Sequence, residues 1–184
     1  MIGYPRYTLV QRLVHWGIAV MAICVLAVGL TLGILGFDGV KATFGMEATN
    51  LLYKYHKTFG VVLLGLMTLR LVLKLMLGTP NYAPPLPRFN KSASAAVHGL
   101  MYLALLVQPV LGWLATAAGG YPVEFFSYKL PGLIAKDPAL SKTLYGLHGS
   151  VGWLLVVLIT IHIGAALMHR YVKRDTVMHR MSLF

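Results

Sequence analysis

The feature that most constrains this chain is a set of four apolar windows, each long enough to cross a lipid bilayer. They cover about residues 13–37, 50–77, 94–117 and 143–168, and a hydrocarbon core needs roughly 20 apolar residues per crossing helix. Backbone polar groups cannot remain unpaired in lipid, so each window is predicted to be helical. The stretch between the first two windows, which holds Asp38 and Glu47, is predicted to be a loop. The sequence therefore predicts an all-α fold, an integral membrane bundle of four transmembrane helices, with residues 1–184 forming a single membrane domain.

Composition supports a membrane protein over a soluble one. The chain is 58% hydrophobic and 11% charged, which lies outside the usual balance of soluble domains. Sixteen basic residues against five acidic ones can indicate nucleic-acid binding. In a membrane protein the same excess is typical of the cytoplasmic ends of spans. We therefore expect membrane lipid, and no nucleic acid, as a partner.

The placement of the basic residues predicts the orientation. All the arginines fall at the amino end, in the Pro-rich second loop (79–91), in the carboxyl tail or at the adjoining helix ends, whereas the opposite face has six lysines and no arginine. Lys and Arg near span ends are retained in the cytoplasm. The first window is too long for a signal peptide, and it holds His15 and Trp16 near its start. The sequence thus predicts a multi-pass protein of the bacterial inner membrane with both termini in the cytoplasm.

Histidines within the windows are the strongest functional signal, because ionisable residues inside a membrane are costly and mark functional sites. His148 and His162 are fourteen residues apart, nearly four helical turns, so they share one face about 21 Å apart along the axis. His15 opens the first window at the cytoplasmic depth of His162, and His56 lies at the outer depth of His148. A helix-to-helix hydrogen bond is the alternative for any one of them.

Two pairs of facing histidines suit the two axial positions of haem iron, one haem near each side of the membrane. Zinc prefers tetrahedral sites with clustered ligands, often thiolates or carboxylates. The windows hold no acidic residue, and Cys24 is their only thiol. A histidine-lined metal transporter is therefore a weaker alternative.

Three further positions repeat the spacing of fourteen. Arg70 follows His56 by fourteen residues and is a candidate partner for a haem propionate, unless it extends to the interface. Gly29 and Gly112 stand fourteen residues after His15 and His98, and they would leave room for a porphyrin face.

His98 competes with His15 as the partner of His162, and it can also bond a propionate, a quinone carbonyl or a neighbouring helix. His169 and His179 in the basic tail are expected to be solvated.

The chain resembles the bacterial cytochrome b561 family over nearly its whole length. The resemblance rests on Leu-Val-His15-Trp16, Tyr-His56-Lys-Thr-Phe-Gly60, Leu-His148-Gly and Ile-His162-Ile-Gly-Ala-Ala-Leu, followed by His169-Arg170-Tyr171 and Arg174-Asp175-Thr176. It implies a four-helix inner-membrane bundle with two haem b groups. It also implies His15, His56, His148 and His162 as the axial ligands and electron transfer between a periplasmic partner and the quinone pool. Some members are described as quinone-linked superoxide oxidases.

The leading hypothesis is an electron-transfer oxidoreductase that links a periplasmic donor, with superoxide as one candidate, to ubiquinone in the membrane. Lys54 and Lys57 flank His56 and either attract a small anion or extend to the interface.

The alternative is an anchor subunit that carries electrons for a partner dehydrogenase or hydrogenase. The aromatic loop 119–142 could dock such a partner, cover the haem or lie in the interface. The candidate quinone contacts are His98, Arg70, Arg12 and Trp16 on the inner side and Lys54, Lys57 and Gln108 on the outer side.

Overall fold

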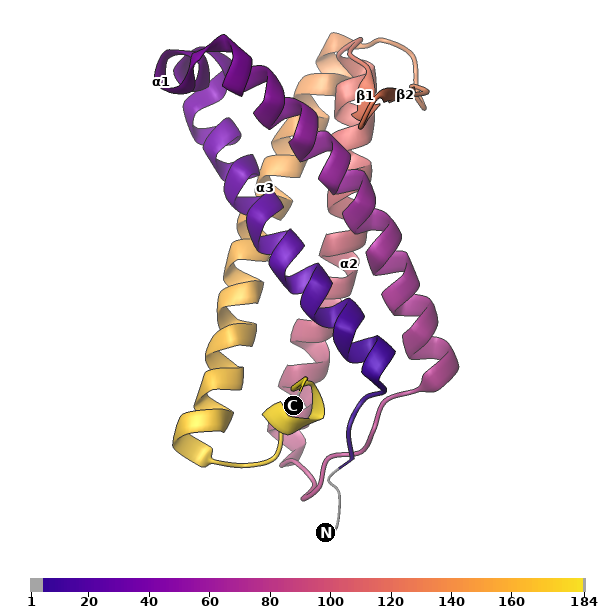
Figure 1. Ribbon diagram of the computed structural model, residues 1–184, viewed down its shortest axis with the longest axis vertical. Helices are drawn as coiled ribbons and strands as arrows, with labels where there is room; N and C mark the ends of the chain where they lie inside the picture. Colours follow the sequence, from indigo (N-terminus) through magenta and orange to yellow (C-terminus); the bar gives the residue numbers. More distant parts are fainter. Residues whose placement is uncertain (1–4, 184) are drawn as a thin grey trace.

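The computed structural model describes residues 5–183. Within these residues, three helices are long and apolar enough to cross a membrane. They are α1 (Leu9–Leu77), α2 (Arg88–Ala118) and α3 (Pro138–Leu167), which continues into a π-helix, η1 (Met168–Lys173) (Figure 1). The prediction of long apolar helices is confirmed, but four separate helices are not observed among the described residues, because α1 runs through the first two predicted windows.

Helix α1 is sharply bent. Gly36 and Gly45 have φ of 64° and 80°, a left-handed region that glycine adopts without steric cost. On either side of these breaks the helix runs in opposite directions (Figure 1). Gln11 near its start donates a hydrogen bond of 3.1 Å from Nε2 to the carbonyl of Gly78 just beyond its end. We call residues 9–35 the first limb and residues 46–77 the second limb.

The predicted loop around Asp38 and Glu47 is therefore wrong, since the described chain is helical between the two glycine breaks. The predicted starts of the later helices are also too late. Helix α2 begins at Arg88, directly after Pro87, and α3 begins at Pro138. At α3 the Asp137 carboxylate accepts hydrogen bonds of 3.0 Å from the amides of Ala139 and Leu140, which satisfies two amides that a helix start leaves unpaired.

The loop between α2 and α3 holds a small antiparallel hairpin, β1 (Val123–Phe125) paired with β2 (Tyr128–Leu130). It lies at the same end of the molecule as the bend in α1 (Figure 1). The prediction of a purely helical chain missed it. The two strands have three residues each, too short to give a sequence signal distinct from a loop.

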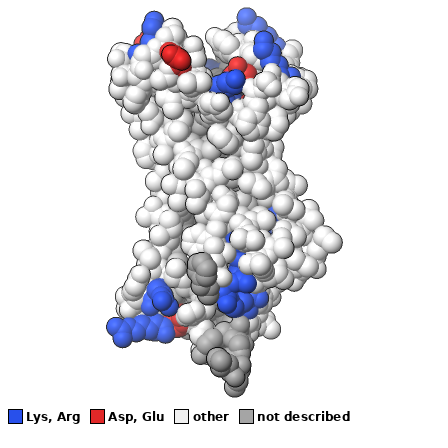
Figure 2. Space-filling view, viewed as in Figure 1, with Lys and Arg blue, Asp and Glu red and all other residues white. Residues whose placement is uncertain are grey.

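The core joins both limbs of α1 to the other two helices. One buried apolar cluster contains residues from each of these segments: Ile18, Ala22, Leu63, Met67, Ala104, Leu105 and Leu155. Many large apolar side chains elsewhere are exposed, as expected of a bundle that faces lipid. On the face shown in Figure 2, an uncharged belt separates charged residues at the two ends of the molecule.

Candidate functional site

Four histidines form two facing pairs near opposite ends of the bundle. His56 on the second limb faces His148 on α3, with ring centroids 6.1 Å apart and ring planes at 85°. His15 on the first limb faces His162 on α3, with centroids 6.2 Å apart and planes at 80°. We call these the hairpin-side pair and the tail-side pair, after the β-hairpin and the carboxyl-terminal tail. The structure thus brings together the same pairs of histidines that were predicted from their expected depth in the membrane.

The spacing of each pair suits a metal ion held between the rings. Two imidazoles on opposite sides of one ion, each at a metal–nitrogen distance of about 2 Å, have centroids about 6 Å apart. Within residues 5–183, no group of three or more His, Cys, Asp or Glu side chains is placed to hold a metal ion. A haem iron takes four nitrogens from its porphyrin and needs only two axial ligands from the protein. The two pairs therefore fit haem.

The ring of His148 is oriented by the backbone of α2. Its Nδ1 lies 3.0 Å from the carbonyl oxygen of Gln108, and a carbonyl only accepts hydrogen bonds, so Nδ1 carries the proton and donates. This tautomer leaves the Nε2 lone pair for a metal. The Gln108 side chain donates in return to the carbonyl of His148, at 2.9 Å. Gln108 thus fixes both the backbone and the ring of His148.

Gly112 and Gly29 give the hairpin-side rings their room. A Cβ at Gly112 would stand 3.0 Å from Cε1 of His148, and one at Gly29 would stand 2.7 Å from Cε1 of His56. His56 also approaches the carbonyl of Val25, although its Nδ1 makes no well-formed hydrogen bond there. Val25 stands four residues before Gly29, which faces the His56 ring. Gln108 likewise stands four residues before Gly112, which faces the His148 ring. Gly29 and Gly112 were predicted to leave room for a porphyrin face. In the structure they leave room for the histidine rings themselves.

An open cleft adjoins the hairpin-side pair, with about 910 Å³ of empty space when the part open to the surroundings is included. Both histidines line it, and the other lining residues are mostly apolar or glycine, among them Gly33, Gly60 and Gly152. A flat apolar macrocycle with its metal between His56 and His148 matches this lining.

Comparison with known proteins agrees with this chemistry. The model of the prokaryotic cytochrome b561 family matches residues 6–182. The chain belongs to this family. It is 26% identical over 176 residues to cytochrome b561 homolog 1 of Escherichia coli (strain K12), covering 96% of each chain. It is 27% identical over 178 residues to homolog 2 of the same strain, covering 96% of this chain and 90% of the relative.

A further relative is named probable superoxide oxidase CybB, from Yersinia pestis. It is 25% identical over 179 residues, covering 97% of this chain and 96% of the relative. Family membership implies haem b and electron transport. Together with the apolar helices, it indicates that this cytochrome is a multi-pass protein of the bacterial inner membrane.

His98 joins the tail-side pair as a third histidine. Its ring centroid lies 5.1 Å from that of His162, with the planes at 80°, which is closer than the spacing of about 6 Å that an intervening ion requires. Its Nδ1 lies 2.6 Å from the carbonyl of Ser94, one turn earlier on α2. His15 therefore has the better spacing as the partner of His162.

Arg70 lies near the tail-side histidines of the cytochrome. Its charge acts on His15, His98 and His162, and its guanidinium carbon is 5.7 Å from the ring centroid of Tyr102. The ammonium of Lys74 is 4.6 Å from the same centroid. The tail-side histidines therefore lie beside two cations that share one aromatic ring.

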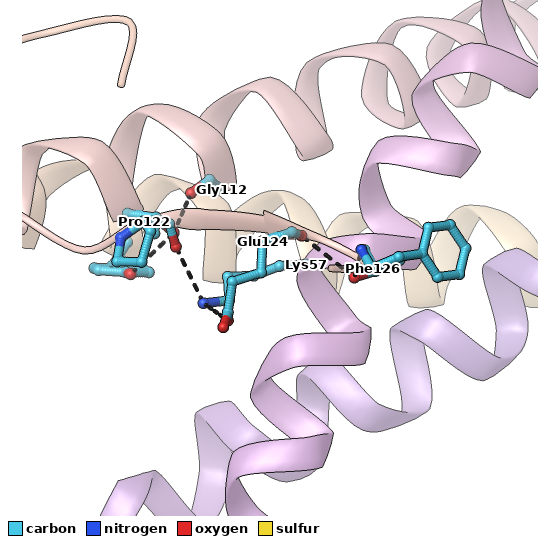
Figure 3. A network of polar contacts seen from close by, with 8 residues as sticks. Lys57, Gly112, Pro122, Glu124 and Phe126 are labelled. Carbon is cyan, nitrogen blue, oxygen red and sulfur yellow. Dashed lines mark hydrogen bonds and ion pairs between the residues drawn. The ribbon is translucent and has the colours of Figure 1, made fainter. Parts of the chain in front are cut away.

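Lys57 holds the β-hairpin against the second limb. Its ammonium lies 2.6 Å from the carboxylate of Glu124 and 3.2 Å from the carbonyl of Pro122 (Figure 3). The neighbouring Thr58 hydroxyl accepts from the amide of Phe126 at 3.2 Å. Lys57 is thus bound within the protein, and its charge is offset by Glu124. Lys54 instead lies 6.0 Å from the ring centroid of Tyr55.

Sequence reasoning missed the role of the tail. His169 was expected to be solvated but is buried, with its Nδ1 2.5 Å from the Asp175 carboxylate, whereas His179 is exposed as expected. Burial alone would raise the pKa of Asp175, but hydrogen bonds from His169 and the amide of Val177 outweigh it and lower that pKa. The motif Arg174-Asp175-Thr176 was the only available signal, and it carried no structural meaning by itself.

Proposed function

We propose that this cytochrome is a single membrane domain (1–184) that crosses the membrane four times and holds two haem b groups. The tail-side haem is bound by His15 and His162, and the hairpin-side haem by His56 and His148. The observation that carries this proposal is the common spacing of the two histidine pairs, 6.1 and 6.2 Å. The four crossings are the two limbs of α1 with α2 and α3.

The arginines give the proposal its direction across the membrane. They lie at the tail-side end of the spans, which we place in the cytoplasm together with both termini; residues 1–4 and 184 themselves lie outside the described part. The tail-side haem is then the inner one and the hairpin-side haem the outer one. In this arrangement electrons pass between the two sides of the membrane by way of both haems.

The protein's contribution to this reaction is to orient the ligands and to offset charge on the cofactor. When bound, haem supplies one-electron chemistry, and two histidine ligands leave the iron no open position for oxygen. Gln108 and Gly112 fix the ring of His148, and Gly29 accommodates His56. Arg70 is placed to offset the negative charge of a propionate on the tail side.

We propose that the electrons pass between a donor on the periplasmic side and ubiquinone in the membrane. The name of the Yersinia pestis relative supports superoxide as that donor. On the tail side, Trp16 donates to the carbonyl of Met181 and Arg12 to that of Ser182, so His98 and Arg70 are the better inner quinone contacts. On the hairpin side, Gln108 lines the cleft, and its Oε1 is buried without a hydrogen-bond partner.

One observation favours the anchor alternative. Tyr121 and Tyr128 in the loop that contains the hairpin are about 70% exposed, which is typical of interface residues. A partner dehydrogenase docked on this loop would lie close to the hairpin-side pair. Its electrons would enter through the same haem.

Stopped-flow spectroscopy tests these functions. With the purified cytochrome in detergent, we expect rapid reduction of both haems by superoxide and by a soluble ubiquinol. His98→Gln and Gln108→Ala test the two quinone sides, and the variant on the correct side slows the ubiquinol reaction about tenfold or more, measured on the haem that each variant retains. Haems that stay oxidised with both reagents, yet are reduced by a purified dehydrogenase, would establish the anchor function instead.

A further inference from the structure

The carboxyl-terminal tail brings a buried arginine to the tail-side end of the bundle. Arg180, in the short helix η2 (Met178–Arg180), is only 8% exposed. Its guanidinium carbon lies 3.7 Å from the ring centroid of Tyr82 and 5.4 Å from that of Tyr7. One amino group donates to the carbonyl of Pro80 at 2.5 Å. The tail is thereby clamped between the amino-terminal segment and the loop before α2.

The charge of Arg180 has no anionic partner among the described residues. Their two ion pairs are Lys57 with Glu124 and His169 with Asp175. The Nε of Arg180 is buried without any hydrogen-bond partner. Aromatic rings attract a cation but do not neutralise it, and a buried charge without a counter-ion is strongly unfavourable. No carboxylate among residues 5–183 therefore offsets the charge of Arg180.

Arg180 belongs to a larger group of cations around the tail-side histidines. His98, on α2, is within reach of the charges of Arg70, Lys74 and Arg180. These three come from two distant parts of the chain, the second limb and the tail. The other groups that face them are the phenols of Tyr7, Tyr82 and Tyr102. In the part of the chain that the structure describes, the group thus holds three cations and no carboxylate.

We propose that Arg180, together with Arg70 and Lys74, binds the propionate carboxylates of the tail-side haem, so that the carboxyl-terminal tail is part of the cofactor site. The proposal rests on the proposed function, since it requires a haem between His15 and His162. Two carboxylates supply the anion that this group lacks, and they avoid hydrocarbon by lying at the membrane surface. Arginine suits this contact because its planar fork binds a carboxylate through two parallel hydrogen bonds.

Redox titration and resonance Raman spectroscopy of the purified holoprotein test this contact. In Arg180→Gln, an uncompensated propionate favours the ferric haem, so we expect the one-electron equilibrium of the tail-side haem to shift about tenfold towards ferric, equal to about 59 mV. The propionate bending band should shift as well, because it follows the hydrogen bonds that the carboxylates accept. Arg180→Lys keeps the charge but loses the fork, so it should shift the band while largely keeping the potential. Arg70→Gln, which leaves the tail intact, should change both.

Arg88→Gln is the matched control, because it removes an exposed arginine of the same end of the molecule. It should change neither the potential nor the band. If Arg180→Gln and Arg70→Gln keep the tail-side potential and band of the wild type, the proposal is wrong and Arg180 only clamps the tail. A lower potential with an unchanged band would also overturn it, since the charge would then act at a distance. A wild-type protein without a tail-side haem would instead refute the proposed function itself.

Discussion

At the scale of single residues, the site depends on the absence of side chains as much as on their presence. Gly29 and Gly112 each face the ring of a hairpin-side histidine, and a Cβ at either position would stand within 3.0 Å of that ring. Protein interiors are close-packed, so such an overlap has to move the ring or the helix. The position of each histidine is therefore set partly by a glycine on the neighbouring helix.

We predict that Gly29→Ala displaces the His56 ring and removes most of the hairpin-side haem, while the tail-side haem remains. Overpacking of this kind costs about 1–3 kcal/mol. Haem per chain, measured from the visible spectrum of the purified variant, checks this.

Gly65→Ala is the matched control, because a Cβ at this position meets nothing within 4 Å. This exposed helical position should gain up to about 1 kcal/mol from alanine and keep both haems. Full haem content in Gly29→Ala would contradict the role that we assign to this glycine.

At the scale of secondary-structure elements, the apolar windows could be predicted because length and hydrophobicity alone decide whether a helix can cross a membrane. The path of the chain between the first two windows could not be predicted. Residues 38–49 contain polar and charged residues that are typical of a loop, yet they are helical here, and the reversal depends on Gly36 and Gly45. Proline marked the start of α2 at Pro87, but the predicted window began only where the apolar residues began.

The histidine pairing was predictable for a related reason. Helical periodicity places His148 and His162 on one face, and the order of the spans sets the depth of each partner. The tail was not predictable, because its contacts join residues far apart in the sequence. Arg180 donates to Pro80, and Thr176 donates to Ala83. Burial of His169 follows from the same folding back of the tail, which no local pattern indicates.

At the scale of the whole molecule, the two ends differ in charge. Arginines gather at the end where the described chain begins and finishes, and the opposite end has lysines together with four of the five acidic residues. Two ends with a different bias in basic residues are what the positive-inside rule requires of a protein with one fixed orientation. The orientation in turn decides which haem faces the periplasm.

We predict that a reporter enzyme that is active only after export is inactive when fused after Phe184. The same reporter fused after Gly120, in the loop before the hairpin, should be active because the proposed orientation puts this loop in the periplasm. Enzyme activity in whole cells, with fusion levels measured by immunoblot, checks both. The reverse pattern of activity would invert the orientation and exchange the inner and outer haems.

The central claim is that two haems are held separately, one by each histidine pair. Its most direct test is the haem content per chain of His148→Ala and His162→Ala beside the wild type, read from reduced-minus-oxidised spectra. The account predicts two low-spin b haems in the wild type and one in each variant, with the hairpin-side haem lost from His148→Ala and the tail-side haem lost from His162→Ala. The two remaining haems should differ in midpoint potential, because only the tail-side haem lies beside Arg70. A wild type with one haem, or variants that both retain two, would contradict the account.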